Sequence, residues 1–92
     1  MFTFDLSDEL RLVMRKLSKK DRKRAEIING KIREIINCNE QGIEHYKNLR
    51  HDLSAYKRVH IDSSFVLMFQ VFKKERHVLF VRLMHHDDAY RR

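Results

Sequence analysis

The chain of 92 residues is long enough for one domain, residues 1–92, with a modest hydrophobic core. Its formal charge of +7, from 20 Lys and Arg against 13 Asp and Glu, favours an anionic target, although such a charge also serves solubility alone. The single cysteine, Cys38, excludes an internal disulfide, and no apolar run approaches the roughly 18 residues of a membrane span. Because the N-terminus also lacks the features of a signal peptide, we expect a cytoplasmic protein without a membrane partner.

The N-terminal segment predicts a short strand and then a helix. Phe2, Phe4 and Leu6 alternate with polar residues, which is the period of a strand. Ser7 is a typical helix N-cap, and the two acidic residues that follow it interact favourably with the dipole of a helix that begins there. Apolar residues at helical spacing then continue to an expected helix end near Leu17.

A second, longer helix is predicted after a new start signal at Ser18, because Asp21 follows three positions later. Its apolar stripe consists of Ala25, Ile28, Ile32, Ile35 and Ile36. The helix is expected to end around Asn37, and a connection of about three residues makes the two helices an αα-hairpin.

Basic side chains crowd the start of this second helix, where they oppose the helix dipole. They are Lys19, Lys20, Arg22, Lys23 and Arg24. Two interpretations fit them: a solvated turn that maintains solubility, or an edge that binds phosphate.

The C-terminal half predicts a three-strand antiparallel meander after an irregular stretch from Glu40 to Leu53. The strands are expected at Leu53–Ile61, Phe65–Phe72 and His77–His86, separated by polar turns. The fold class is therefore α+β, in the order β-α-α-β-β-β, with both helices packed on one face of the sheet.

Strand alternation assigns side chains to the two faces of this sheet. The face toward the helices is expected to carry Val59, Ile61, Leu79, Val81 and Leu83. The opposite, open face is expected to carry Arg58, His60, Arg82 and His86. This assignment requires that no bulge shifts the register by one residue.

Two segments carry a resemblance to a known family. The first runs Lys47-x-Leu49-x-x-x-Leu53-x-x-Tyr56 into Arg58-Val59-His60-Ile61, and the second reads His85-His86-Asp87-Asp88-Ala89-Tyr90. With the order strand, helix hairpin and meander, they make the chain similar to the RelE/ParE toxin superfamily, and most similar to its YafQ branch. Most RelE-like toxins cut mRNA in the ribosomal A site, and an acidic antitoxin neutralises them by wrapping around them.

The resemblance implies a set of site residues. It matches the branch's strand histidine to His60, its C-terminal histidine to His86 and the following aromatic residue to Tyr90. The aromatic residue that opens the central strand is matched by Phe65. In more general members a closing His-Arg pair would instead match His85 and His86.

Three positions depart from the family pattern. An additional upstream histidine is replaced by Lys47, and an arginine near the start of the central strand is replaced by Val66. The aspartate before the aromatic residue is Ser64, with Asp62 nearby as a substitute. These departures concern the acid–base set and leave the predicted fold unchanged.

RNA cleavage without a metal or cofactor needs a base, an acid and cations around one phosphate. Histidine suits both proton roles because its pKa is ordinarily about 6.5. We assign His86 as the general acid and His60 as the general base, assisted by Asp62, with Tyr90 stacking on a base or orienting the substrate. The phosphate and RNA contacts are assigned to Lys47, Arg58, Arg82, His85, Phe65, Lys19, Lys20, Arg22 and Lys23.

Other functions and roles remain open. A ParE-like toxin would inhibit DNA gyrase without hydrolysis, and a catalytically inactive module of this fold would only bind RNA or protein. His60 could equally be an ordinary polar residue on an exposed strand. The adjacent His85 and His86 suggest a metal site, but neighbouring strand residues point to opposite faces and no further ligands stand at zinc spacing.

The expected partners follow from the leading interpretation. A cognate acidic antitoxin, mRNA and the ribosome are anticipated. We expect a hetero-oligomer with the antitoxin and a monomer when the toxin is free.

Overall fold

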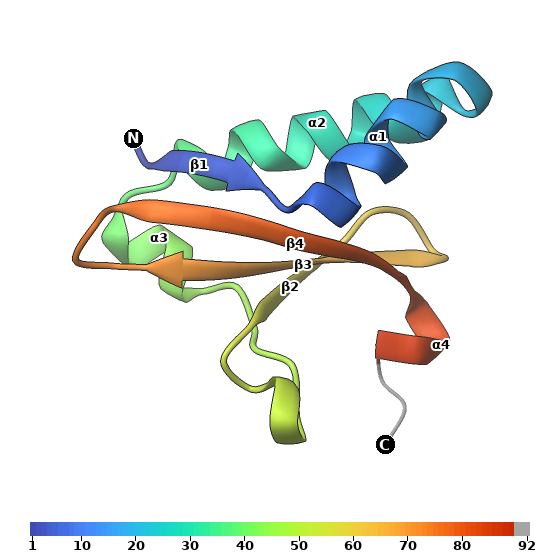
Figure 1. The fold of residues 1–92 in the computed structure, drawn as a ribbon. Helices are drawn as coiled ribbons and strands as arrows, with labels where there is room; N and C mark the ends of the chain where they lie inside the picture. The colour runs from blue at the N-terminus through green and yellow to red at the C-terminus, as the bar shows by residue number, and fades with distance from the viewer. Residues whose placement is uncertain (90–92) are drawn as a thin grey trace.

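A four-stranded mixed sheet with two long helices on one face forms the body of the protein (Figure 1). The computed structural model describes residues 1–89. The elements in chain order are β1 (Thr3–Leu6), α1 (Asp8–Lys20), α2 (Arg22–Ile36), α3 (Glu40–Glu44), the 3₁₀ helix η1 (His51–Leu53), β2 (Lys57–His60), β3 (Phe65–Phe72), β4 (His77–His85) and α4 (His86–Ala89). The predicted α+β class is confirmed.

The strand order in the sheet is β1-β4-β3-β2. Strands β2, β3 and β4 form the predicted antiparallel meander. Strand β1 joins the outer side of β4 in parallel, and α1 and α2 connect it to the far edge of the sheet. Within residues 1–89, no helix has the length and apolar character that a bilayer crossing requires.

The helix hairpin differs from the prediction at its connection. Helix α1 continues to Lys20, three residues beyond the expected end at Leu17, and only Asp21 separates it from α2. Asp21 is itself the N-cap of α2, because its carboxylate accepts a hydrogen bond from the Arg24 backbone N–H at 3.2 Å. Lys20 and the lysine before it therefore lie in the last turn of α1, where cations interact favourably with the helix dipole.

A bulge in β4 overturns part of the predicted face assignment. Met68 pairs with Arg82 and Phe69 pairs with Phe80, so Val81 is an extra residue on β4. The phase of β4 changes there by one residue, and Phe80 faces the helices. The prediction that Leu79 and Val81 face the helices is therefore wrong. Val59, Ile61 and Leu83 do pack against the helix-side cluster, as predicted.

The bulge lies where β1 leaves the sheet. The backbone N–H of Ser7 donates to Phe80 O at 2.8 Å, and its hydroxyl donates to Val81 O at 2.5 Å. The same hydroxyl oxygen accepts from Leu10 N at 3.1 Å, which confirms Ser7 as the N-cap of α1. One serine thus ends β1, begins α1 and holds the bulge.

The segment before the meander is more regular than predicted, and the first strand is shorter. Helix α3 and the 3₁₀ helix η1 occupy part of the stretch that was expected to be irregular. Strand β2 begins at Lys57 rather than Leu53, because residues 51–53 form η1 and a turn follows. At the other end, His86 belongs to α4 rather than to the last strand.

Two hydrophobic clusters lie on the two faces of the sheet. The helix-side cluster comprises Phe2, Leu10, Ile28, Ile32, Ile35, Ile36, Ile43, Ile61, Leu67, Phe69, Val78 and Phe80. The smaller second cluster comprises Leu49, Val66, Met68 and Ala89. Because Ala89 of α4 covers part of it, the open face has an apolar centre beneath its polar residues.

Candidate active site

Two histidine rings meet at the end of the sheet where β2 stops and α4 begins. His60 is the last residue of β2, and His86 is the first residue of α4. Their ring centroids lie 5.5 Å apart with an interplanar angle of 42°. The pKa of imidazole is ordinarily about 6.5. Two imidazoles this close can therefore act on one bound phosphate group, one accepting a proton from it and the other donating a proton to it.

The backbone of the β2–β3 turn sets this spacing. Ile61 N donates to Phe65 O at 2.9 Å, which closes the turn directly after His60. His86 N donates to Ser64 O at 2.7 Å, which ties the start of α4 to the same turn. The separation of the two rings therefore depends on the conformation of this turn.

Asp62 shapes the turn with both of its carboxylate oxygens. Oδ1 accepts from the backbone N–H groups of Ser64 at 2.7 Å and Phe65 at 3.3 Å, and Oδ2 accepts from Arg24 Nε at 3.1 Å. The Ser64 N–H first, and then the Arg24 guanidinium, lower the pKa of Asp62. A carboxylate with a low pKa is a weak proton acceptor, so this geometry favours a structural role for Asp62 over the catalytic one that the sequence suggested.

The lowered pKa makes the contribution of Asp62 to stability depend on pH. A carboxyl group with a depressed folded pKa stabilises the fold above its unfolded pKa, and this stabilisation is lost as the pH falls through the folded pKa. Above pH 3.8, the ordinary pKa of this group, we expect Asp62→Asn to have a lower melting temperature than the wild type. The difference in melting temperature should shrink as the pH falls further. Circular dichroism melts across this range measure the difference. A difference independent of pH would contradict the assignment.

The three cations assigned to the scissile phosphate follow one row across the open face. Arg58 pairs with Met68 and Met68 pairs with Arg82, so these side chains share a face. Arg58 N donates to Lys47 O at 2.9 Å, which places the exposed Lys47 beside it at the sheet edge. Arg82 donates to both carboxylate oxygens of Glu9, at 2.8 and 3.2 Å. The row is cationic, and Glu9 offsets part of its charge at the Arg82 end.

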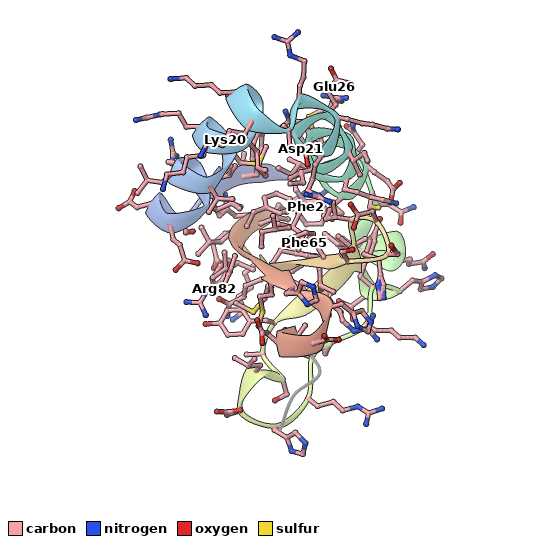
Figure 2. All side chains as sticks on the ribbon, turned by 90° about the vertical axis from the view of Figure 1, so that its right-hand side faces the viewer. Phe2, Lys20, Asp21, Glu26, Phe65 and Arg82 are labelled. Atoms are coloured by element: carbon pink, nitrogen blue, oxygen red, sulfur yellow. The ribbon has the colours of Figure 1, made fainter. Side chains whose placement is uncertain are left out.

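Phe65 and His85 lie on the helix side of the sheet. They are register partners with ring centroids 5.6 Å apart, and Phe65 packs against the helix-side cluster. The guanidinium carbon of Arg24 lies 4.6 Å from the centre of the Phe65 ring. Figure 2 shows Phe65 at the sheet, below Asp21 at the helices. Of the two adjacent histidines, it is His86 that shares a site with His60.

The basic residues of the helix connection lie away from the histidine pair. They are Lys19, Lys20, Arg22 and Lys23, all exposed around Asp21. Figure 1 shows the helix hairpin and α4 on opposite sides of the sheet, and Figure 2 shows Lys20 at the level of the helices. These cations do not join the candidate active site, so a phosphate contact by them would be a separate one.

Two further points from the sequence concern Tyr90 and a possible metal site. Tyr90 lies outside the described residues. Within residues 1–89, no three His, Cys, Asp or Glu side chains gather closely enough to hold a metal ion.

Arg24, which the sequence analysis grouped with the basic cluster, instead reaches the turn beside the histidine pair through its contacts with Asp62 and Phe65.

Solved structures of similar fold define the class to which this architecture belongs. The YoeB/ParE toxin from Agrobacterium tumefaciens superposes with a TM-score of 0.77 at 15% identity, over 92% of this chain and 99% of that one. A metal-bound toxin from Helicobacter pylori gives a TM-score of 0.72 at 19% identity, over 96% and 98% of the two chains. At these identities the comparison establishes the fold, which is that of small α+β toxins.

Sequence relatives establish the family. No protein-family profile matches the chain. The candidate toxin RelE4 of Methanocaldococcus jannaschii is 44% identical over 92 residues, which is all of this chain and 94% of the relative. An uncharacterised protein of Methanosarcina mazei is 38% identical over 90 residues, covering 98% of this chain and all of that protein. The chain belongs to the RelE/ParE-like toxin superfamily, whose members are toxins of toxin–antitoxin systems. The YafQ branch remains a prediction.

Proposed function

We propose that this protein is the toxin of a toxin–antitoxin pair and acts as a metal-independent endoribonuclease that cleaves mRNA in the ribosomal A site. The observation that carries this proposal is the His60–His86 pair, with ring centroids 5.5 Å apart beside a cationic sheet face. Gyrase inhibition requires no proton transfer, so it gives no reason for two adjacent imidazoles. The pair therefore favours the nuclease over a ParE-like activity.

The proposed reaction uses the 2′-OH of the RNA as its nucleophile. His60 takes the proton of the 2′-OH as its oxygen forms a bond to phosphorus. His86 protonates the 5′-oxygen as the phosphorus–oxygen bond to the leaving nucleotide breaks. The products are a 2′,3′-cyclic phosphate and a free 5′-OH, and the reaction is specific for RNA because DNA lacks the attacking hydroxyl.

The remaining residues are assigned to binding. Lys47, Arg58 and Arg82 neutralise the scissile phosphate and the charge that develops on it. Tyr90 stacks on or orients a nucleotide, and stacking of this kind contributes about 1–3 kcal/mol. The position of Phe65 on the helix side argues against stacking by that residue at this site.

We assign the protein to the cytoplasm, where its proposed substrate is translated. The charge of +7 suits an acidic antitoxin as well as RNA. An antitoxin that wraps around the toxin accounts for a hetero-oligomeric resting state, with a monomeric toxin when free.

A cell-free translation reaction tests the proposed activity. Purified toxin is added to a translated mRNA and to the same mRNA without ribosomes, and the ends of the fragments are analysed. We expect fragments with a 2′,3′-cyclic phosphate in the translated reaction. An RNA with a 2′-deoxy substitution at the mapped site should remain intact there. Cleavage of that substituted position, or no cleavage of any mRNA, would count against the proposed chemistry.

A further inference from the structure

We propose that Arg24 and Asp62 form a clamp that positions the His60–His86 pair, so that Arg24 is a positioning residue for the reaction although it lies on a helix across the sheet. This inference rests on the proposed function. The Arg24–Asp62 clamp is defined by the 3.1 Å hydrogen bond between Arg24 Nε and Asp62 Oδ2.

The guanidinium of Arg24 makes two further contacts besides the one to Asp62. Its Nη1 donates to Asp21 Oδ2 at 2.8 Å, so the residue that caps α2 also orients the guanidinium. Its Cζ lies 4.6 Å from the centre of the Phe65 ring. An arginine bound on two edges and stacked on one face has little rotational freedom, which makes it a fixed anchor for Asp62.

Asp62 transmits this position to the backbone of the turn. Its Oδ1 receives the N–H groups of Ser64 and Phe65, while its Oδ2 receives Arg24. Each carboxylate oxygen therefore has a separate function, one in shaping the turn and one in tying the turn to α2. An uncharged asparagine oxygen could still accept the two backbone N–H groups, whereas the ion pair with Arg24 requires the carboxylate charge.

The β2–β3 turn determines the positions of both histidines. Ser64 O receives the backbone N–H of His86 at 2.7 Å, and Phe65 O receives that of Ile61, the residue after His60. A shift of the turn would therefore move the two imidazoles relative to each other. Because proton transfer requires hydrogen-bond distance, a displacement of about 1 Å can lower a catalytic rate by up to about 100-fold.

The test is Arg24→Ala, measured as kcat and KM for RNA cleavage under the conditions in which the wild type is active. We expect kcat to fall by about tenfold and KM to change by less than about twofold, because the variant misplaces catalytic groups rather than removing a substrate contact. Arg24→Lys should recover part of kcat, because it restores the charge but not the stacked, two-edged contact. An unchanged kcat in Arg24→Ala would overturn the clamp, as would a loss confined to KM.

Two matched variants separate positioning from charge and from stability. Arg33→Ala removes the same charge from the far end of α2, where the side chain is exposed, and should leave kcat unchanged. Asp21→Asn keeps a capping oxygen but removes the ion pair that orients the Arg24 guanidinium, so it should lower stability and lower kcat by less than Arg24→Ala does. If Arg33→Ala lowers kcat as much as Arg24→Ala, or if Asp21→Asn lowers it more, the specific role of the clamp is refuted.

An NMR measurement keeps the clamp testable apart from the nuclease activity. The imidazole resonances of His60 and His86 should shift in Arg24→Ala and in Asp62→Asn, and should stay in place in Arg33→Ala. Unmoved resonances would refute the clamp even if RNA is cleaved. Shifted resonances in a protein that cleaves no RNA would support the clamp and reject the proposed function. If Arg24→Ala does not fold, the same comparison is made with Arg24→Lys.

Discussion

His86→Ala should lower the rate of RNA cleavage by about 100-fold or more, because it removes the proposed general acid for the 5′-oxygen leaving group. The ring of His86 lies 5.5 Å from that of His60 between centroids, and in the variant His60 alone would have to carry out both proton transfers. Single-turnover cleavage of a defined RNA measures the effect without interference from product release.

The control for this prediction is His45→Ala. His45 is an exposed histidine at the C-terminal end of α3, outside the candidate active site. It should leave the cleavage rate within about twofold of wild type, since surface substitutions rarely change more than their own contacts. If folded His86→Ala cleaves RNA at the wild-type rate, the assignment of His86 is wrong.

Phe69→Ala should reduce the free energy of unfolding by about 3–5 kcal/mol. Phe69 is fully buried in the central strand, and its ring contacts those of Tyr46 and Phe80 at centroid distances of 5.6 and 5.8 Å. The truncation removes one aromatic ring from the centre of the helix-side cluster and leaves a cavity. Because small domains have only about 5–15 kcal/mol of total stability, this single change should bring the protein close to unfolding.

Urea denaturation followed by circular dichroism measures this loss, with Leu12→Ala as the control. Leu12 is 55% exposed on the outer face of α1, so its truncation should change the free energy of unfolding by no more than about 0.5 kcal/mol. A loss below about 1 kcal/mol for Phe69→Ala would show that the sheet does not pack on the helices through this ring.

The sequence predicted the elements better than it predicted their junctions. Ser7 was identified as an N-cap, and the structure confirms it, because the signal is local to one turn of helix. Asp21 was misread as part of a capping box begun at Ser18, because both residues are good caps and only tertiary packing decides between them. The parallel placement of β1 against β4 was likewise beyond a local pattern.

The β4 bulge shows why alternation alone could not assign both faces. Strict alternation predicted Leu79, Val81 and Leu83 on the helix face, and only Leu83 is there. The extra residue at Val81 is stabilised by Ser7, which lies 74 positions earlier in the chain. No pattern within the strand reports a contact that distant, so the register shift was not predictable from β4 itself.

The candidate site was predicted in part. His60 was placed on the open face by alternation, and its register pairing with Val66 of the second cluster agrees. His86 was placed there as a strand residue, but it reaches His60 as the first residue of α4. The link from Arg24 to Asp62 spans 38 positions, and the sequence contains no signal for such a tertiary contact.

The most direct test of the nuclease is primer extension on a translated mRNA from cells in which the toxin is induced. Cells that express the wild type should stop growing and show cuts phased with the codons. Cells that express His60→Ala/His86→Ala should grow and show none. Growth arrest without cuts would contradict the account and favour a gyrase-directed toxin. Cuts that persist in the double variant would show that the two histidines do not carry the reaction.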